Sequence, residues 1–302
     1  MRRKASAETP KPSLPSALDA AASILSAPYG ALAVHYDTVM AHVDYPGWSR
    51  HLRGLWRTVR GRTGKTATPR RILELAAGTC RLAEHPLFPE VFSVHTDLSP
   101  QMLASARPRV GKGRAKNKFP VRSACDALAL PFRNGSSEGS TQTGFDLVLM
   151  VYDSLNYLTR PEEVRRAFDE ALRVLTPGGV FLVDVTTETC SRRHFADTLD
   201  FQETEAGAVV RASRYDAESR TQLNLFTFFT IGEDGRYDRT EEVHRQRVWP
   251  AAFLKKTARE AGFSVRACLS DFTLKPGGDR DERLHFVLEK PNAEKPGAQK
   301  AR

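Results

Sequence analysis

A short apolar segment followed by a run of small residues constrains the fold of this chain most. Ile72-Leu73-Glu74-Leu75 predicts a buried strand, and Ala76-Ala77-Gly78-Thr79 can form a tight turn. Residues 91–97 predict a second strand that ends in Asp97. This order is typical of a doubly wound α/β sheet that holds an adenosine ligand. The small residues let the backbone approach the ligand, and the acid accepts hydrogen bonds from ribose hydroxyls.

The rest of the chain repeats the order of strand, helix and strand, which favours a parallel sheet. One or two helices are predicted over residues 31–60. Ser99 and Pro100 suit the start of a helix after the second strand, and Pro161 opens another. Strands of the sheet are expected at residues 70–76, 91–97, 119–124, 145–151, 180–185, 263–272 and 284–288.

Residues 199–248 break this order. Three strands are predicted there, at 208–215, 221–231 and 239–248, and the turns between them are short. Short turns join strands that pair antiparallel. We therefore expect a small antiparallel meander inserted into the α/β domain, as a lid or substrate platform, and a helix after it over residues 250–262.

Length and composition fit one large α/β domain or two small ones, since the chain has 302 residues of which 40% are hydrophobic. No apolar run approaches about 18 residues, so no membrane span is predicted. The cysteines form no C-x-x-C pair and do not lie near a histidine at ligand spacing, so we expect no metal site, no disulfides and a reducing cytoplasm. They are Cys80, Cys125, Cys190 and Cys268.

The net charge of +9 is concentrated in two runs without acids, residues 50–71 and 107–122. A nucleic-acid surface is one interpretation, and two solvated basic loops are the other. Both runs lead into the starts of strands, whereas ligands of a parallel sheet bind beyond the carboxyl ends. The loops are therefore expected mostly on the face opposite the site, which makes a nucleic-acid partner the weaker interpretation.

Together, five motifs resemble those of the class I S-adenosylmethionine-dependent methyltransferases over roughly residues 30–290. They are Glu74-Leu-Ala-Ala-Gly-Thr-Cys80, Asp97-Leu-Ser-Pro-Gln-Met-Leu103, Asp126 before Leu130-Pro-Phe132, Phe145-Asp146, and Leu175-Thr-Pro-Gly-Gly179. Further details near Tyr36, Asp153 and Glu242 are similar to a small-molecule-type subgroup with an antiparallel insertion. The resemblance implies a Rossmann-like, mostly parallel sheet with an antiparallel last strand. The methyltransferase domain would span residues 14–290, between disordered tails at 1–13 and 291–302.

The resemblance implies S-adenosylmethionine as cofactor and assigns roles around it. Glu74 corresponds to the acid that organises the turn at the methionine moiety, Asp97 to the ribose-binding acid and Asp126 to the acid that accepts from the adenine amino group. Tyr36 is either a core aromatic or closes over the ligand. The full set of implied cofactor residues is Tyr36, Glu74, Ala76, Gly78, Asp97, Leu98, Met102, Asp126, Ala127, Met150 and Tyr152. The chain departs from the family turn where Ala76 and Cys80 replace glycines, and we expect Cys80 to be a small buried residue.

Methyl transfer from a sulfonium is an in-line displacement, so the protein mainly aligns the reactants and excludes water. His244 is the candidate base, because strand alternation places Glu242 and His244 on one face, although this strand could equally be a solvated surface. Asp153 and Tyr157 follow a strand's carboxyl end and are candidate catalytic residues, the alternative being a helix-capping turn. The candidate substrate contacts are Asn156, Glu242 and Arg247.

Three functions stay open from the sequence. The first is methyl transfer to nitrogen or oxygen of a small molecule, by a monomer or homodimer without a metal. The second is an RNA or protein methyltransferase that uses the basic loops, and the third is a non-catalytic S-adenosylmethionine-binding module, suggested by the glycine-poor turn. A nicotinamide dehydrogenase is disfavoured because G-x-G-x-x-G is missing.

Overall fold

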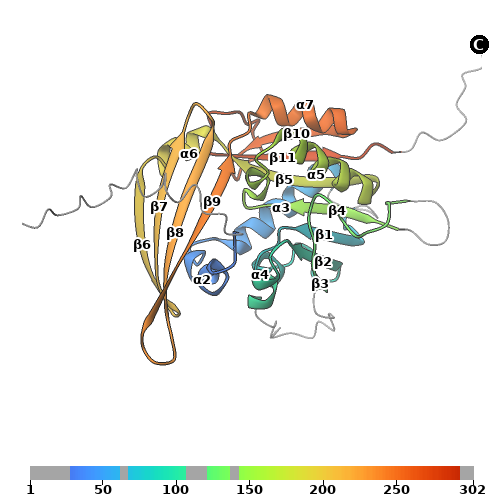
Figure 1. The fold of residues 1–302 in the computed structure, drawn as a ribbon. Coiled ribbons are helices and arrows are strands. Elements are labelled where there is room, and N and C mark those ends of the chain that lie inside the picture. The colour runs from blue at the N-terminus through green and yellow to red at the C-terminus, as the bar shows by residue number, and fades with distance from the viewer. Residues whose placement is uncertain (1–27, 62–66, 107–120, 137–142, 293–302) are drawn as a thin grey trace, which may run out of the picture.

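The computed structural model describes residues 28–61, 67–106, 121–136 and 143–292. Its centre is a seven-stranded sheet in the order β10-β11-β5-β4-β1-β2-β3, in which β11 runs antiparallel to both of its neighbours and the other pairs are parallel (Figure 1). The prediction of a mostly parallel sheet with an antiparallel last strand is thus confirmed. The strands are β1 (Arg71–Leu75), β2 (Phe92–Asp97), β3 (Val121–Ala124), β4 (Phe145–Met150), β5 (Leu175–Thr186), β10 (Ser264–Ser270) and β11 (Arg283–Glu289).

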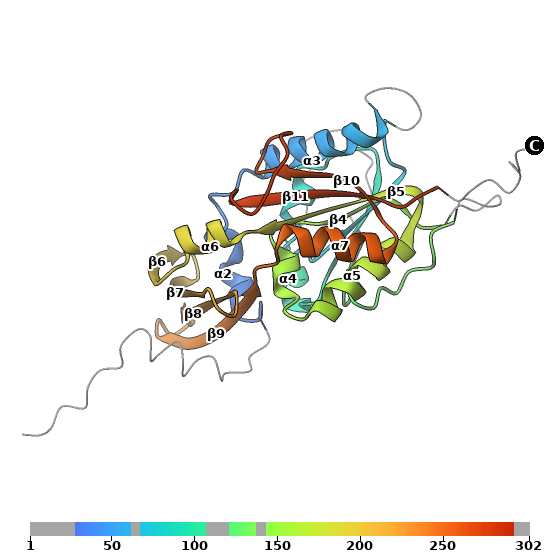
Figure 2. The ribbon, with the colours of Figure 1, turned by 90° about the horizontal axis from the view of Figure 1, so that it is seen from above.

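Helices cover both faces of this sheet (Figure 2). On one face lies α3 (Tyr45–Arg60), whose buried Leu52, Leu55 and Trp56 pack on β1, β4 and β5. On the other face, α5 (Pro161–Val174) and α7 (Ala251–Ala261) pack against the same strands through a second apolar core. A short α4 (Pro100–Ser105) follows β2, and the 3₁₀ turns η1 (Arg81–Glu84) and η2 (Ser154–Tyr157) follow β1 and β4.

The insertion is a separate antiparallel sheet of four strands, not three. It consists of β6 (Thr198–Thr204), β7 (Gly207–Asp216), β8 (Thr221–Ile231) and β9 (Tyr237–Arg247), and α6 (Glu188–His194) leads into it from β5. The prediction missed β6 because this edge strand is largely exposed and carries no apolar run. Its ladder with β7 nevertheless extends from Thr198 to Thr204.

The N-terminal segment joins the two sheets. Helix α2 (Leu32–Val39) lies between them in Figure 1, and its Leu32 packs against Val209, Phe226 and Phe228 of the second sheet. The Glu242 carboxylate of β9 accepts hydrogen bonds from backbone N–H groups of Tyr29 and Leu32 at 3.0 and 3.3 Å, and a further one from Ala31. An acid at a helix N-terminus is stabilising, so Glu242 holds this segment in place.

Several predicted boundaries need correction. The first basic run is not a loop, because residues 50–60 belong to α3, and most of the second run lies outside the described residues. Strand β5 begins at Leu175 rather than Val180, since Leu175 already pairs with Phe145 of β4. The predicted tails lie almost wholly outside the described residues.

In the described part of the chain no helix is long and apolar enough to cross a membrane.

Candidate active site

The turn after β1 curls around the carboxyl end of β2. The Gly78 N–H donates to Asp97 Oδ2 at 2.7 Å, and Gly78 has φ +57°, a left-handed conformation that suits glycine. A Cβ at this position would meet Met102 Cε at 3.1 Å. Ala76 and Cys80 adopt the same left-handed region with φ of 51° and 58°, which costs each of them about 1 kcal/mol relative to glycine. Cys80 is buried against Ala83 and Ala106, as predicted.

Asp97 is held by backbone groups on both carboxylate oxygens. Its Oδ1 accepts from the Ser99 N–H at 2.8 Å, and the Ser99 side chain in turn caps α4 by accepting from the Met102 N–H. Burial raises the pKa of Asp97 above its ordinary value, and the N–H groups of Ser99 and Gly78 oppose that rise. The carboxylate therefore retains lone pairs for hydroxyl donors of a ligand.

A histidine that the sequence did not single out supports Glu74. His95 lies across the β1–β2 ladder from Glu74, and its Nδ1 contacts Glu74 Oε2 at 2.5 Å, with both side chains buried. The register of a parallel pair could have revealed this contact, because partners in the ladder share a face of the sheet.

The eleven predicted cofactor residues surround one cavity of about 300 Å³. They come from α2, the carboxyl ends of β1, β2 and β4 with the turns that follow them, α4, and the segment after β3. Pro28, Tyr29 and Gly30 close this cavity from the N-terminal segment, a contribution that was not predicted. The Tyr152 hydroxyl on its wall is enclosed and has no partner among the described residues.

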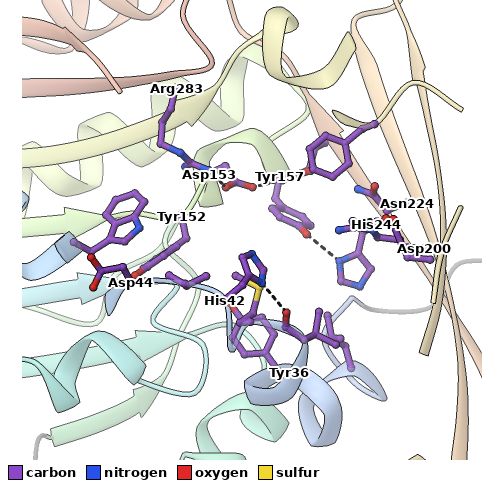
Figure 3. A pocket seen from close by; sticks show the side chains of 18 of the residues that line it. Tyr36, His42, Asp44, Tyr152, Asp153, Tyr157, Asp200, Asn224, His244 and Arg283 are labelled. Carbon is purple, nitrogen blue, oxygen red and sulfur yellow. Dashed lines mark hydrogen bonds and ion pairs between the residues drawn. The ribbon is translucent and has the colours of Figure 1, made fainter. Parts of the chain in front are cut away.

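A second cavity of about 1050 Å³ adjoins the first and lies between α2, α3 and the inner face of the second sheet (Figure 3). Four tyrosines line both cavities: Tyr29, Tyr36, Tyr152 and Tyr157. We call this larger space the acceptor cavity. Its wall also carries Arg50 from the first basic run, which was expected to lie mostly on the opposite face.

His244, Glu242 and Tyr157 form a hydrogen-bonded chain that ends at the junction of the two cavities. His244 is 1% exposed, its Nε2 lies 3.1 Å from Glu242 Oε2, and its Nδ1 lies 2.9 Å from the Tyr157 hydroxyl (Figure 3). A carboxylate only accepts hydrogen bonds, so Nε2 carries the proton and Nδ1 accepts from Tyr157. The face of β9 with these residues is buried and is not a solvated surface.

Asp153 joins a buried network on another wall of the acceptor cavity. It has φ 51°, and its carboxylate accepts from Arg283 Nη2 at 2.9 Å and from Gln246 Nε2 at 2.7 Å. Arg283 also contacts Asp184, which is completely buried. Burial raises the pKa of Asp184 to about 6, against the opposing effect of Arg283.

The predicted substrate contacts do not fit this geometry. Asn156 is completely buried, and its amide bonds the backbone of Thr186 and Arg247, so it ties β5 to β9. The Arg247 guanidinium donates to the Thr159 carbonyl and lies over Trp249, and Glu242 holds the N-terminal segment. None of the three lines either cavity. Each satisfies groups that are distant in sequence, which the local pattern could not show.

Comparison with known proteins assigns the family. Residues 72–179 match the model of a methyltransferase domain. The "putative methyltransferase" of Geobacillus sp. (strain WCH70) is 30% identical over 263 residues, which cover 87% of this chain and 99% of that protein. The chain belongs to the S-adenosylmethionine-dependent methyltransferases. A Bacillus subtilis (strain 168) protein of the same description is 28% identical over 87% of this methyltransferase and 97% of its own length.

Solved structures share the fold of this methyltransferase. An S-adenosylmethionine-dependent methyltransferase from Clostridium acetobutylicum ATCC 824 has a TM-score of 0.66 at 22% identity, with 87% of this chain and 99% of that chain covered. A sugar N-methyltransferase from Streptoalloteichus sp. ATCC 53650 has a TM-score of 0.62 at 19% identity, with 96% and 100% covered.

The residues of the methyltransferase around the smaller cavity fit its cofactor, S-adenosylmethionine. Asp97 would offer its carboxylate to the ribose hydroxyls, and the exposed Asp126, the residue that the motif order implies for the adenine amino group, lines the same cavity. Glu74 lies at the carboxyl end of β1, where the methionine moiety would lie. Because Gly78 has no Cβ, the backbone of this turn could come close to the ligand.

The buried Asp184 predicts a pH dependence of stability. Its pKa is about 6 when folded and its ordinary value is 3.8, so between these pH values the folded protein binds more protons than the unfolded one. The free energy of unfolding of the native protein should therefore fall as pH rises from about 4 to 7. This fall should be about 1–3 kcal/mol larger than the fall in the Asp184→Asn variant over the same pH range. Urea unfolding of both proteins at each pH measures this. Equal pH dependence in the two proteins would contradict the assignment.

Proposed function

We propose that this methyltransferase transfers a methyl group to a nitrogen or oxygen atom of a small molecule bound in the acceptor cavity. The observation that carries the proposal is the shared wall of the two cavities, formed by Tyr29, Tyr36, Tyr152 and Tyr157. A cavity of about 1050 Å³ is at the upper end of ordinary small-molecule sites. The shared fold of a sugar N-methyltransferase also supports a small acceptor.

The second sheet acts as the substrate platform in this proposal. Its inner face supplies Gln222 and Asn224 from β8 and His244 and Gln246 from β9 to the acceptor cavity. Helix α2 contributes Tyr36 to the shared wall and Leu32, Val39 to the acceptor cavity. Together these elements separate the reacting groups from bulk water, which direct displacement requires.

Bound S-adenosylmethionine supplies an electrophilic methyl group on its sulfonium sulfur. Tyr157 lines both cavities, where an acceptor N–H or O–H would approach this group. Its oxygen accepts a hydrogen bond from Tyr29 with one lone pair and has the other to accept that proton. As Tyr157 accepts it, its own proton passes to His244 Nδ1, and Glu242 stabilises the imidazolium that forms. In this proposal Tyr157 contacts the methyl acceptor directly, and His244, the predicted base, receives the proton from Tyr157.

Burial supports a relay role for Tyr157 over a phenolate role. It raises the pKa of Tyr157 well above the ordinary value of a phenol, although a hydrogen bond from Tyr29 opposes the rise. The phenol therefore stays neutral at neutral pH and can pass a proton on. Asp153 completes this wall, because its carboxylate adjoins Tyr157 and is oriented by Gln246 and Arg283.

Isotope transfer tests the proposed function. The protein is incubated with S-adenosylmethionine carrying a deuterated methyl group and, separately, with the small-molecule extract, total RNA and proteins of cells that express the gene. We expect label in the small-molecule fraction at a rate that changes little with salt. Label only in RNA, with steep salt dependence, would favour the basic surface instead. Cofactor binding without label in any fraction would indicate a non-catalytic module.

A further inference from the structure

An ordered row of amide side chains lines the acceptor cavity on the second sheet. Gln222 and Asn224 alternate along β8, Gln246 lies across from Gln222 on β9, and Asn224 pairs with Ser213 on β7 and His244 on β9. Asn224 is 5% exposed, Gln222 3% and Gln246 6%. In the proposed proton relay, Gln246 only orients Asp153, and Gln222 and Asn224 have no role.

The orientation of each amide follows from Asp153. A carboxylate can only accept, so Gln246 turns its Nε2 toward Asp153, at 2.7 Å, and its Oε1 toward Gln222. Gln222 must then present Nε2, which lies 3.1 Å from Gln246 Oε1, and its own Oε1 accepts from the Ser191 hydroxyl at 2.9 Å. The direction of donation is therefore fixed from Ser191 through to Asp153.

The same constraint fixes Asn224. Gln222 Nε2 lies 3.4 Å from Asn224 Oδ1, and the Ser213 hydroxyl donates to the same oxygen at 2.7 Å. A flipped Asn224 would place two N–H₂ groups against each other, which is unfavourable. The Asn224 Nδ2 atom has no hydrogen-bond partner among the described residues. It is also not fully enclosed by protein atoms. This N–H₂ group therefore opens onto the acceptor cavity, on the strand next to His244 (Figure 3).

We propose that Asn224 is a specificity-determining residue, which requires a hydrogen-bond-accepting oxygen on the methyl acceptor close to the atom that is methylated. This rests on the proposed function and narrows its substrate class to small molecules with such an oxygen, whether carbonyl, hydroxyl or ether. An acceptor without the oxygen leaves the Asn224 N–H₂ group desolvated and unpaired, which is how polar sites reject close analogues. Asp153 contributes as a positioning residue, because its charge sets the direction of the row.

Asn224→Asp tests the proposal. The new side chain has the same shape and can still accept from Ser213 and Gln222, but it presents an oxygen to the cavity in place of a donor. With deuterated-methyl S-adenosylmethionine and dilutions of the small-molecule extract, we expect the rate of label transfer at low extract concentration to fall by about tenfold or more. The loss should shrink as the extract is concentrated. The labelled products of the native protein should carry the oxygen.

Thr227→Val is the matched control, because Thr227 lies on β8 but on the opposite face of the sheet, beside Glu241. It should transfer label at the native rate. S-adenosylhomocysteine affinity and thermal unfolding, unchanged in Asn224→Asp, show that the variant is folded and binds the cofactor. Native transfer by Asn224→Asp, or products without an accepting oxygen, would overturn the role of Asn224 and leave the proposed function standing. No transfer by the native protein would overturn both.

Discussion

Replacing Tyr157 with phenylalanine should lower kcat for methyl transfer by about two orders of magnitude and change S-adenosylmethionine affinity by less than about threefold. The hydroxyl is the only part removed, and its hydrogen bond to His244 Nδ1 at 2.9 Å connects the acceptor to the buried imidazole and carboxylate. The ring itself stays to form the shared wall of the two cavities. Rates with the labelled small molecule and calorimetry with the cofactor separate the two effects.

His244→Ala is the companion variant, and we expect it also to reduce turnover much more than cofactor binding. Because Tyr157 and His244 act as one relay, the double variant should be little slower than the slower single variant. Strictly additive losses would show that the two residues act independently. Native turnover in both single variants would remove the relay from the mechanism and leave alignment of the reactants as the main contribution of the protein.

Asp97→Ala should weaken S-adenosylmethionine binding by about 1–3 kcal/mol, because the ligand would lose a buried charged acceptor. The N–H groups of Gly78 and Ser99 would lose their partner too, at 2.7 and 2.8 Å in the native protein, so the turn itself would be less well ordered. Calorimetric titration measures the change in affinity.

Asp169→Ala is the control for Asp97→Ala, since Asp169 pairs with Arg165 on the surface of α5 and lies outside both cavities. Its cofactor affinity should equal that of the native protein. Unchanged affinity in Asp97→Ala would mean that the ribose hydroxyls bind elsewhere, and the pocket assignment around β2 would have to be abandoned.

The cofactor side of the site was predictable from sequence because its signals are local. Gly78 and Asp97 are close to the strand ends that carry them, and the ladder of β1 with β2 brings them together. All the implied cofactor residues line one cavity for the same reason. The end of helix α7 was also predictable from sequence, because Gly262 ends it in the left-handed conformation with φ +106°.

The acceptor side was predicted less well because its contacts join distant parts of the chain. Asn156 and Glu242 carry the residue types of a substrate site, but their partners are backbone groups on other elements. A local signal for Asn224 did exist: Gln222 and Asn224 are polar residues at alternate positions of a strand that is otherwise largely apolar. Such a pattern places amides on one face of a sheet, and only the structure shows that this face borders a cavity.

The attachment of the N-terminal segment by Glu242 has a consequence for how the protein is made. Tyr29 and Glu242 are 213 residues apart in sequence, so the ribosome releases the segment long before its carboxylate partner exists. The central strands β1 to β4 can pair during that interval, since all of them precede the second sheet in the chain. The Ser99 hydroxyl can bond the Tyr29 carbonyl before then, but the Glu242 contact beside the wall formed by Pro28, Tyr29 and Gly30 forms only after β9 has emerged. A nascent chain halted before residue 242 would carry the cofactor motifs without the carboxylate that anchors the backbone N–H groups of Tyr29 and Leu32 beside the cofactor cavity.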